Sequence, residues 1–173
     1  MQHVKILQLD GNLMNLALSK LARYHVERGD TVSFHEPNPD LVYVGAIFDW
    51  TAKRFKGQGM LTKAKIIRGG PPFSDERLSP EIDALMPYYP LWGVDYSLGY
   101  TSRGCIRACD FCIVPRIEGG IRNDQPVSQF HDPSHKKVIL LDNNFLASPR
   151  WKENCDYIKD QALQVCFCQG LDI

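Results

Sequence analysis

The feature that most constrains the fold is the alternation of short apolar runs with helical patterns across residues 1–74. Apolar runs at residues 4–9, 31–34, 41–48 and 64–67 each have the length of a buried strand. Strands that alternate with helices favour a parallel sheet with helices on both faces. We therefore predict an α/β fold, in which residues 1–74 form a small doubly wound, Rossmann-like domain.

Two helical patterns join these runs. Asn12 is the predicted N-cap of the first helix and Gly29 its predicted stop. The expected apolar face of this helix comprises Leu13, Leu16, Ala17, Leu21 and Tyr24. Asp49 is expected to cap a second helix, which ends near Lys56.

Ligands of such sheets bind beyond the carboxyl ends of the strands. The first strand is followed by D-G-N-L-M-N at residues 10–15, which is neither G-x-G-x-x-G nor a P-loop. No dinucleotide or nucleoside triphosphate is therefore indicated for this domain.

Residues 75–94 are rich in proline and tyrosine, and we predict a linker that packs on the surface, because its apolar side chains need partners. A strand at 96–101 is expected to lead into a cysteine-rich segment. A strand at 138–141, a helix at 149–163 and a strand at 165–167 are expected to follow.

Three of the six cysteines lie in the segment G-C-I-R-A-C-D-F-C-I-V-P-R-I-E at residues 104–118, whereas residues 1–104 contain none. Cys105, Cys109 and Cys112 have the spacing C-x3-C-x2-C. They could share one face of a buried helix, or bind zinc with His131 or His135 as a fourth ligand. They could also hold an iron–sulfur cluster. Three thiolates on a four-iron cluster leave one iron open to a substrate or cofactor.

The motif, with Phe111 directly before its third cysteine, resembles that of the radical S-adenosylmethionine (SAM) superfamily. The longer stretches Y-T-S-R-G-C at 100–105 and F-C-I-V-P-x-x-E-G at 111–119 resemble members with an N-terminal cobalamin-binding-like domain. The resemblance implies that Cys105, Cys109 and Cys112 hold a [4Fe–4S] cluster whose open iron binds SAM. An external reductant of the flavodoxin or ferredoxin type would drive cleavage of SAM to a 5′-deoxyadenosyl radical.

The resemblance also suggests contacts to SAM. Phe111 would lie beside the adenine, and three polar residues after the second strand of the barrel would lie near the amino group of SAM. These three residues are Asp142, Asn143 and Asn144, for which a helix-capping turn is the alternative. Gln169, after the third strand, is a further candidate for SAM binding.

Cobalamin is not expected, because residues 13–15 replace the His and Gly of the D-x-H-x-x-G signature that cobalamin-binding domains carry. For the remaining cysteines, Cys155, Cys166 and Cys168, we predict packing in the core. On a strand, Cys166 and Cys168 would share one face, either in the interior of the barrel or, as the alternative, as a second pair of ligands.

Radical SAM members usually close about six βα units into a partial barrel, each of roughly 30 residues. Residues 95–173 have room for two units and a third strand, so we expect the N-terminal part of a radical SAM core, apparently truncated, with weakened or absent activity. Whether the chain is an enzyme is therefore uncertain, and its substrate is not specified. The alternative is a non-catalytic metal-binding module that holds iron–sulfur or zinc.

Charge and hydropathy limit the partners of the chain. Lysine plus arginine (20) balances aspartate plus glutamate (20), so nucleic acid is not indicated. No apolar run approaches the length of a membrane span, and the N-terminus has no secretory signal pattern. We predict a cytoplasmic protein without a membrane partner.

Overall fold

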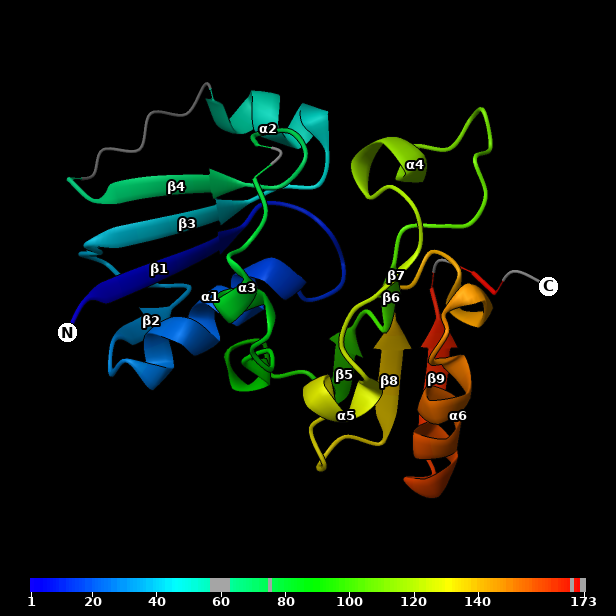
Figure 1. The fold of residues 1–173 in the computed structure, drawn as a ribbon. Coiled ribbons are helices and arrows are strands. Elements are labelled where there is room, and N and C mark those ends of the chain that lie inside the picture. The colour runs from blue at the N-terminus through cyan, green and yellow to red at the C-terminus, as the bar shows by residue number, and fades with distance from the viewer. Residues whose placement is uncertain (57–62, 75, 169, 172–173) are drawn as a thin grey trace. The chain divides into compact units, whose positions relative to one another are not determined.

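The computed structural model describes residues 1–56, 63–74, 76–168 and 170–171, and the chain divides into two compact units, Met1–Gly93 and Val94–Ile173 (Figure 1). The first unit contains β1 (His3–Gln8), α1 (Leu16–Glu27), β2 (Thr31–Ser33), β3 (Leu41–Gly45), α2 (Asp49–Lys56), β4 (Lys65–Gly69), α3 (Pro80–Asp83) and the 3-10 helix η1 (Tyr89–Leu91). The second unit contains β5 (Tyr96–Gly99), β6 (Ser102–Arg103), α4 (Val114–Ile117), β7 (Arg122–Asn123), α5 (Val127–Phe130), β8 (Lys137–Leu140), the 3-10 helix η2 (Phe145–Ala147), α6 (Trp151–Asp160) and β9 (Gln164–Phe167).

The first unit is a parallel sheet in the order β2-β1-β3-β4, covered on both faces. Alternate residues of its strands point to opposite faces. Val4 and Ile6 of β1 pack with Leu18 of α1 on one face, while Val42 and Phe55 of β3 and α2 pack together on the other. The predicted doubly wound α/β architecture is therefore confirmed.

The first helix begins later than its sequence indicates. Asn15, and not Asn12, is the N-cap, because its side-chain oxygen accepts a hydrogen bond from the N–H of Leu18 at 3.1 Å. Of the predicted apolar face, Leu21 packs against the core of the sheet, but the buried residues of the helix are Leu18, Ser19, Lys20, Ala22 and His25. Gly29 ends the helix as predicted, with a φ of 80° and an N–H that donates to the carbonyl of Val26.

Most of the predicted linker belongs to the first unit, which extends to Gly93 and does not end at residue 74. The ammonium group of Lys20, whose side chain is 2% exposed, donates to the carboxylate of Asp83 at 3.0 Å. The N–H of Tyr88 donates to the carbonyl of Ser19, and the indole N–H of Trp92 donates to Gln8. These contacts fasten the proline-rich segment to α1 and β1, because its polar and aromatic groups find partners there.

The second unit is built on a parallel sheet in the order β5-β8-β9. Each strand of this sheet pairs with the one that follows it in the chain. Val138 and Leu140 of β8 pack against Val127 and Phe130 of α5. Ile158 of α6 joins the same core, so both helices cover one face. Short antiparallel pairing joins β6 to β7 beyond the carboxyl end of β5. The predicted strand at 96–101 therefore ends early, at Gly99, and β6 begins only at Ser102.

A chain of three polar side chains, centred on the buried His25, links α1, the residue before β2, and β3 in the first unit. The Nδ1 atom of His25 lies 2.8 Å from the Asp30 carboxylate, and its Nε2 atom lies 3.1 Å from the Tyr43 hydroxyl. Hydrogen bonds from His25 and from the N–H of Gln2 lower the pKa of Asp30 below its ordinary value. Burial raises the pKa of Tyr43.

We expect Asp30→Asn to lower stability at neutral pH and to weaken the response of the protein to acid. Because the pKa of Asp30 is lower in the folded state, its contribution is complete above the unfolded-state pKa of about 4 and is lost as the pH falls through the lowered value. Urea midpoints measured between neutral and acidic pH should converge for the variant and wild type at low pH. A difference between them that is constant with pH would contradict this assignment.

Among the described residues, no helix combines the length and apolar character needed to cross a bilayer.

Candidate functional site

The three clustered cysteines lie in one segment, residues 104–119, which we call the cysteine loop and which is irregular up to the short helix α4. Cys105, Cys109 and Cys112 are all half-buried free thiols. None of them is in a helix, and an N–H···O bond of 2.9 Å from Cys112 to Cys109 forms a turn between them. The interpretation that they share the face of a buried helix is therefore wrong. The loop projects from the edge at which β5, β8 and β9 have their carboxyl ends (Figure 1).

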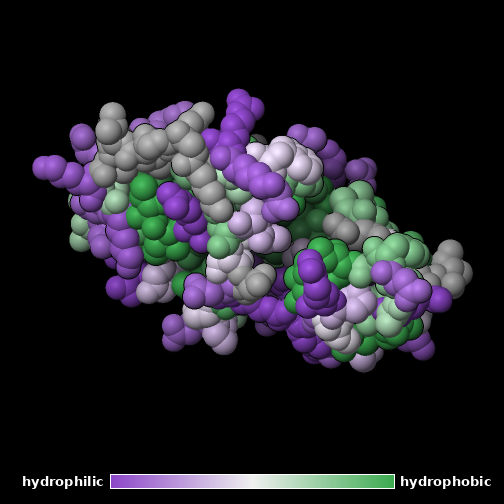
Figure 2. Space-filling view, turned by 90° about the horizontal axis from the view of Figure 1, so that it is seen from above, coloured by the Kyte–Doolittle hydropathy of each residue, from purple (hydrophilic) through white to green (hydrophobic). Residues whose placement is uncertain are grey.

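The cysteine loop exposes several large apolar side chains. Phe111 is 94% exposed, and Ile106, Ile113 and Ile117 are also exposed. In the view from above, hydrophobic residues reach the surface among hydrophilic ones (Figure 2). An aromatic ring held in this position is available to stack on a planar ligand, which is the role that the sequence predicts for Phe111.

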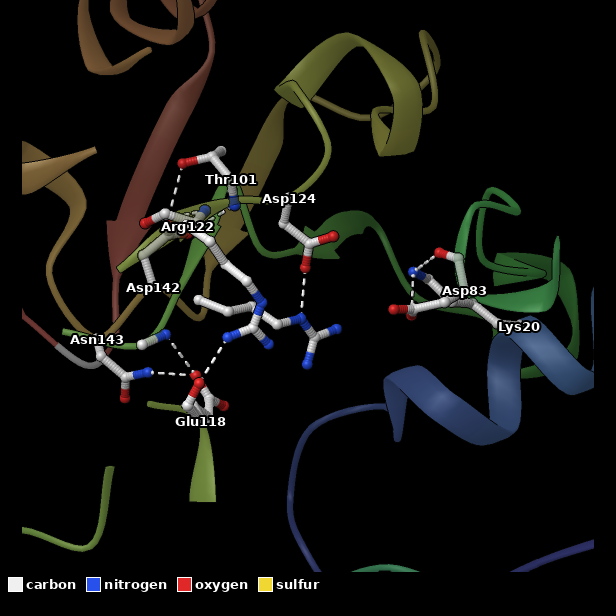
Figure 3. Close-up of polar contacts among 11 residues, drawn as sticks. Lys20, Asp83, Thr101, Glu118, Arg122, Asp124, Asp142 and Asn143 are labelled. Carbon is white, nitrogen blue, oxygen red and sulfur yellow. Dashed lines mark hydrogen bonds and ion pairs between the residues drawn. The ribbon is translucent and has the colours of Figure 1, made fainter. Parts of the chain in front are cut away.

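Glu118 joins the two ends of the cysteine loop, in the region where Gly104 approaches residues 118–120, which we call the neck. Its carboxylate oxygen Oε2 accepts hydrogen bonds from the N–H of Gly104 at 2.7 Å and from Nδ2 of Asn143 at 2.9 Å (Figure 3). The carbonyl of Glu118 accepts a hydrogen bond from Arg122 at 2.6 Å. Glu118 therefore ties the start of the loop to its end and both to the residues that follow β8.

Gly104 is required at this neck. Its φ of 77° is in the left-handed region, and a Cβ atom there would lie 2.3 Å from the carbonyl oxygen of Gly120. The N–H of Cys105 donates to the carbonyl of Gly119 at 3.3 Å, so the two ends of the loop run in close contact. The Gly and Glu-Gly positions of the motif thus have a structural explanation.

Asp142 fixes the chain that leads into the loop. Its carboxylate, on a residue that is 2% exposed, accepts hydrogen bonds from the N–H and hydroxyl groups of both Thr101 and Ser102, at 2.6 to 3.0 Å. Figure 3 shows the bonds to Thr101. Oδ1 accepts three of these bonds and Oδ2 accepts one. We therefore assign Asp142 to positioning of the loop, and its contact to SAM stays a prediction.

An ion pair adds to the neck on the side of β6. Arg103 pairs with Asp124, and the central carbon of its guanidinium lies 4.1 Å from the centre of the Tyr100 ring. Burial raises the pKa of the Tyr100 hydroxyl. The N–H of Asp124 donates to the carbonyl of Thr101, which holds β7 beside the chain entering the loop.

Asn144 connects the end of β8 to the first cysteine. It is 1% exposed, its oxygen caps η2 by accepting from the N–H of Ala147, and its Nδ2 atom lies 3.7 Å from Sγ of Cys105. The N–H of Arg107 donates to the same sulfur at 3.4 Å. The helix-capping alternative therefore holds for Asn144, while Asn143 contacts Glu118. Gln169, the remaining predicted SAM contact, lies outside the described residues.

The loop thiols suit a thiophilic metal or cluster by donor type, and N–H groups on a ligating sulfur are a known means of tuning a cluster. Among the described residues, however, no three His, Cys, Asp or Glu side chains are already grouped as a metal site. Binding would therefore have to draw the three thiols of the loop together, as expected where ligands assemble on metal binding.

The two histidines proposed as a fourth zinc ligand are engaged elsewhere. The Nδ1 atom of His131 lies 2.9 Å from the Tyr157 hydroxyl, and its Nε2 atom lies 3.0 Å from the carbonyl of His135. The Nδ1 atom of His135 lies 3.1 Å from the hydroxyl of Ser97. Both histidines are buried and lie in the segment that enters the amino end of β8, whereas the loop lies at the carboxyl ends of the strands, which disfavours a shared zinc site.

The core-packing prediction holds for one of the other three cysteines. Cys155 is half-buried and packs against the core of the second unit. Cys166 and Cys168 are exposed, so the prediction is wrong for them. They lie on the face of β9 opposite Val165 and Phe167, which contact that core, and no helix of the described residues covers them.

Comparison with protein-family models, curated proteins and solved structures gave no match to this chain.

Proposed function

We propose that the chain is a radical SAM iron–sulfur protein, in which Cys105, Cys109 and Cys112 hold a [4Fe–4S] cluster. The observation that carries this proposal is a loop with three thiols, fastened at both ends to the carboxyl edge of a parallel sheet. That edge is where ligands of α/β sheets bind. The substrate, and activity in this chain alone, are left open.

When bound, the cluster would supply an electron, received from a flavodoxin- or ferredoxin-type reductant, for the cleavage of SAM to a 5′-deoxyadenosyl radical. The chain's own residues would prepare the site. The N–H of Arg107 and the amide of Asn144 point at Sγ of Cys105, and hydrogen bonds to a ligating sulfur tune a cluster. Glu118 and Asp142 hold the two ends of the loop, and the exposed ring of Phe111 is available for the adenine.

A non-catalytic metal-binding module is the second candidate. It is favoured by Asp142, the first polar residue after β8, because its carboxylate accepts four hydrogen bonds from Thr101 and Ser102 and so has a structural role in the chain that enters the loop. In this alternative the cluster, or a zinc ion, would fold the loop without chemistry.

We further propose a cytoplasmic location. All six cysteines are free thiols in the structure, and free thiols persist in reducing compartments.

We expect Cys109→Ala to lose most of its iron and sulfide after anaerobic reconstitution, because two thiolates hold a four-iron cluster poorly. Cys155→Ala is the matched control, since Cys155 packs against the core, and it should keep the wild-type iron content. The measurement is iron and sulfide per chain, with the EPR spectrum of the reduced protein. Equal iron in Cys109→Ala and wild type would overturn the ligand assignment.

A second readout separates the enzyme from the module. SAM should change the EPR spectrum of the wild-type cluster, and Phe111→Ala should keep its iron but need more SAM for the same change. Stacking on one aromatic ring contributes about 1 to 3 kcal/mol. A cluster whose spectrum does not respond to SAM, or a chain that retains only zinc, would support the module.

A further inference from the structure

Cys166 and Cys168 form a second group of thiols, separate from the cysteine loop. Their sulfur atoms lie 3.5 Å apart, and both residues are exposed. Residues two apart on a strand point to the same face, so the pair is presented on the side of β9 that the described helices leave uncovered.

The strand holds this pair in place. Phe167, between the two cysteines, packs against the core, where its ring centre lies 5.0 Å from that of Phe145. The N–H of Cys168 donates to the carbonyl of Leu140 at 3.1 Å. The backbone of the pair is thus held by the packing of Phe167 and by the hydrogen bond to Leu140, while both thiols remain exposed.

The separation of the sulfurs suits two ligands of one ion better than a disulfide. A disulfide needs an S–S distance of about 2.05 Å, so the sulfurs would have to approach by roughly 1.5 Å. Two thiolates on a tetrahedral ion with bonds of about 2.3 Å stand about 3.8 Å apart, which is close to the observed separation.

We propose that Cys166 and Cys168 form a bidentate dithiol site for a soft, thiophilic ion. Soft ions select thiolate ligands, and no other His, Cys, Asp or Glu among the described residues completes a group of three with the pair. Within the described part of the chain the other coordination positions are therefore open, which suits an ion that arrives with ligands of its own.

Phenylarsine oxide is a suitable probe, because its arsenic requires two neighbouring thiols. Two S–H bonds and the As–O bond break, two As–S bonds form, and the oxygen leaves as water with both protons. The arsenic stays trivalent, so no oxidant or reductant is needed. Capture by two thiols on one strand should exceed capture by one thiol by at least about tenfold, since the second bond is intramolecular.

The experiment uses the full chain with Cys105, Cys109 and Cys112 replaced by serine, which removes the loop thiols. Intact-mass spectrometry after removal of excess probe should show one phenylarsenic adduct. The adduct should disappear on adding Cys168→Ser and persist on adding Cys155→Ser. An adduct that survives Cys168→Ser, or is absent when both thiols are present, would overturn the proposal.

Circular dichroism checks that the serine background folds. If it does not, the same single changes are made in the wild-type chain. There, Cys168→Ser should remove one adduct per chain and Cys155→Ser none, while equal adduct counts in both would overturn the proposal. Neither result depends on an iron–sulfur cluster in the loop, so the two proposals can fail separately.

Discussion

Gly104→Ala should destabilise the second unit by about 3 kcal/mol or more. A non-glycine residue in the left-handed region costs about 1 to 2 kcal/mol, and here the added methyl group would also lie 2.3 Å from the oxygen of Gly120. The neighbouring atoms are backbone, so the neck can relieve the overlap only by opening. Hydrogen exchange of peptides from β5 and β8 would measure the loss, and iron retention should fall with it.

Gly119→Ala is the matched control for this change. Gly119 has the same φ of 77°, but no atom lies within 4 Å of the position that its Cβ would occupy. It should therefore cost only the conformational term, about 1 to 2 kcal/mol. Equal losses in the two variants would show that the close approach of Gly104 to Gly120 does not contribute.

Asp142→Ala should have a comparable or larger effect, about 3 to 5 kcal/mol. The change leaves buried N–H and hydroxyl groups of Thr101 and Ser102 without their acceptor, and each unsatisfied buried group costs about 1 to 3 kcal/mol. Water that enters the space left by the carboxylate can bind some of these groups and so reduce the total loss of stability. We expect the entrance to the cysteine loop to lose its order, with lower protection of β6 in hydrogen exchange.

Asp132→Ala is the matched comparison for Asp142→Ala, because Asp132 also accepts hydrogen bonds from a backbone N–H and a hydroxyl but is less buried. Asp132 accepts hydrogen bonds from the N–H and hydroxyl of Ser134, at 2.9 and 2.7 Å. Because water can replace these bonds, its loss should cost about 0.5 to 2 kcal/mol. If Asp142→Ala were no more harmful than Asp132→Ala, the positioning role of Asp142 would be wrong.

The sheets could be predicted because their central strands are nearly continuous apolar runs, which is typical of strands that are buried on both faces of a parallel sheet. The start of α1 could not, since Asn12 and Asn15 are both good caps. Tertiary contact decided between them: the side chain of Gln8 accepts from the N–H of Asn15 and donates to the carbonyls of Asp10 and Leu13. These bonds hold the segment before Asn15 out of the helix.

The site was only partly accessible to sequence reasoning. The cysteine spacing indicated the thiol cluster, but the roles of Glu118 and Asp142 depend on contacts between segments far apart in sequence. Asp142 and Thr101 are separated by 41 positions, and no local pattern links them. One signal was present: Gly104 and the pair Gly119-Gly120 bracket the motif, as expected where two backbone segments approach closely.

The neck also affects how the sequence of such a protein can evolve. Gly104, Glu118 and Asp142 fasten the loop where it leaves the sheet, so the segment between these anchors can gain or lose residues without moving a strand. The entropic cost of closing a longer loop rises only as the logarithm of its length, about 0.6 kcal/mol for each doubling. The spacing of the thiols and the stability of the sheet can therefore be selected separately, and loops of other lengths could be transplanted onto the same three anchors.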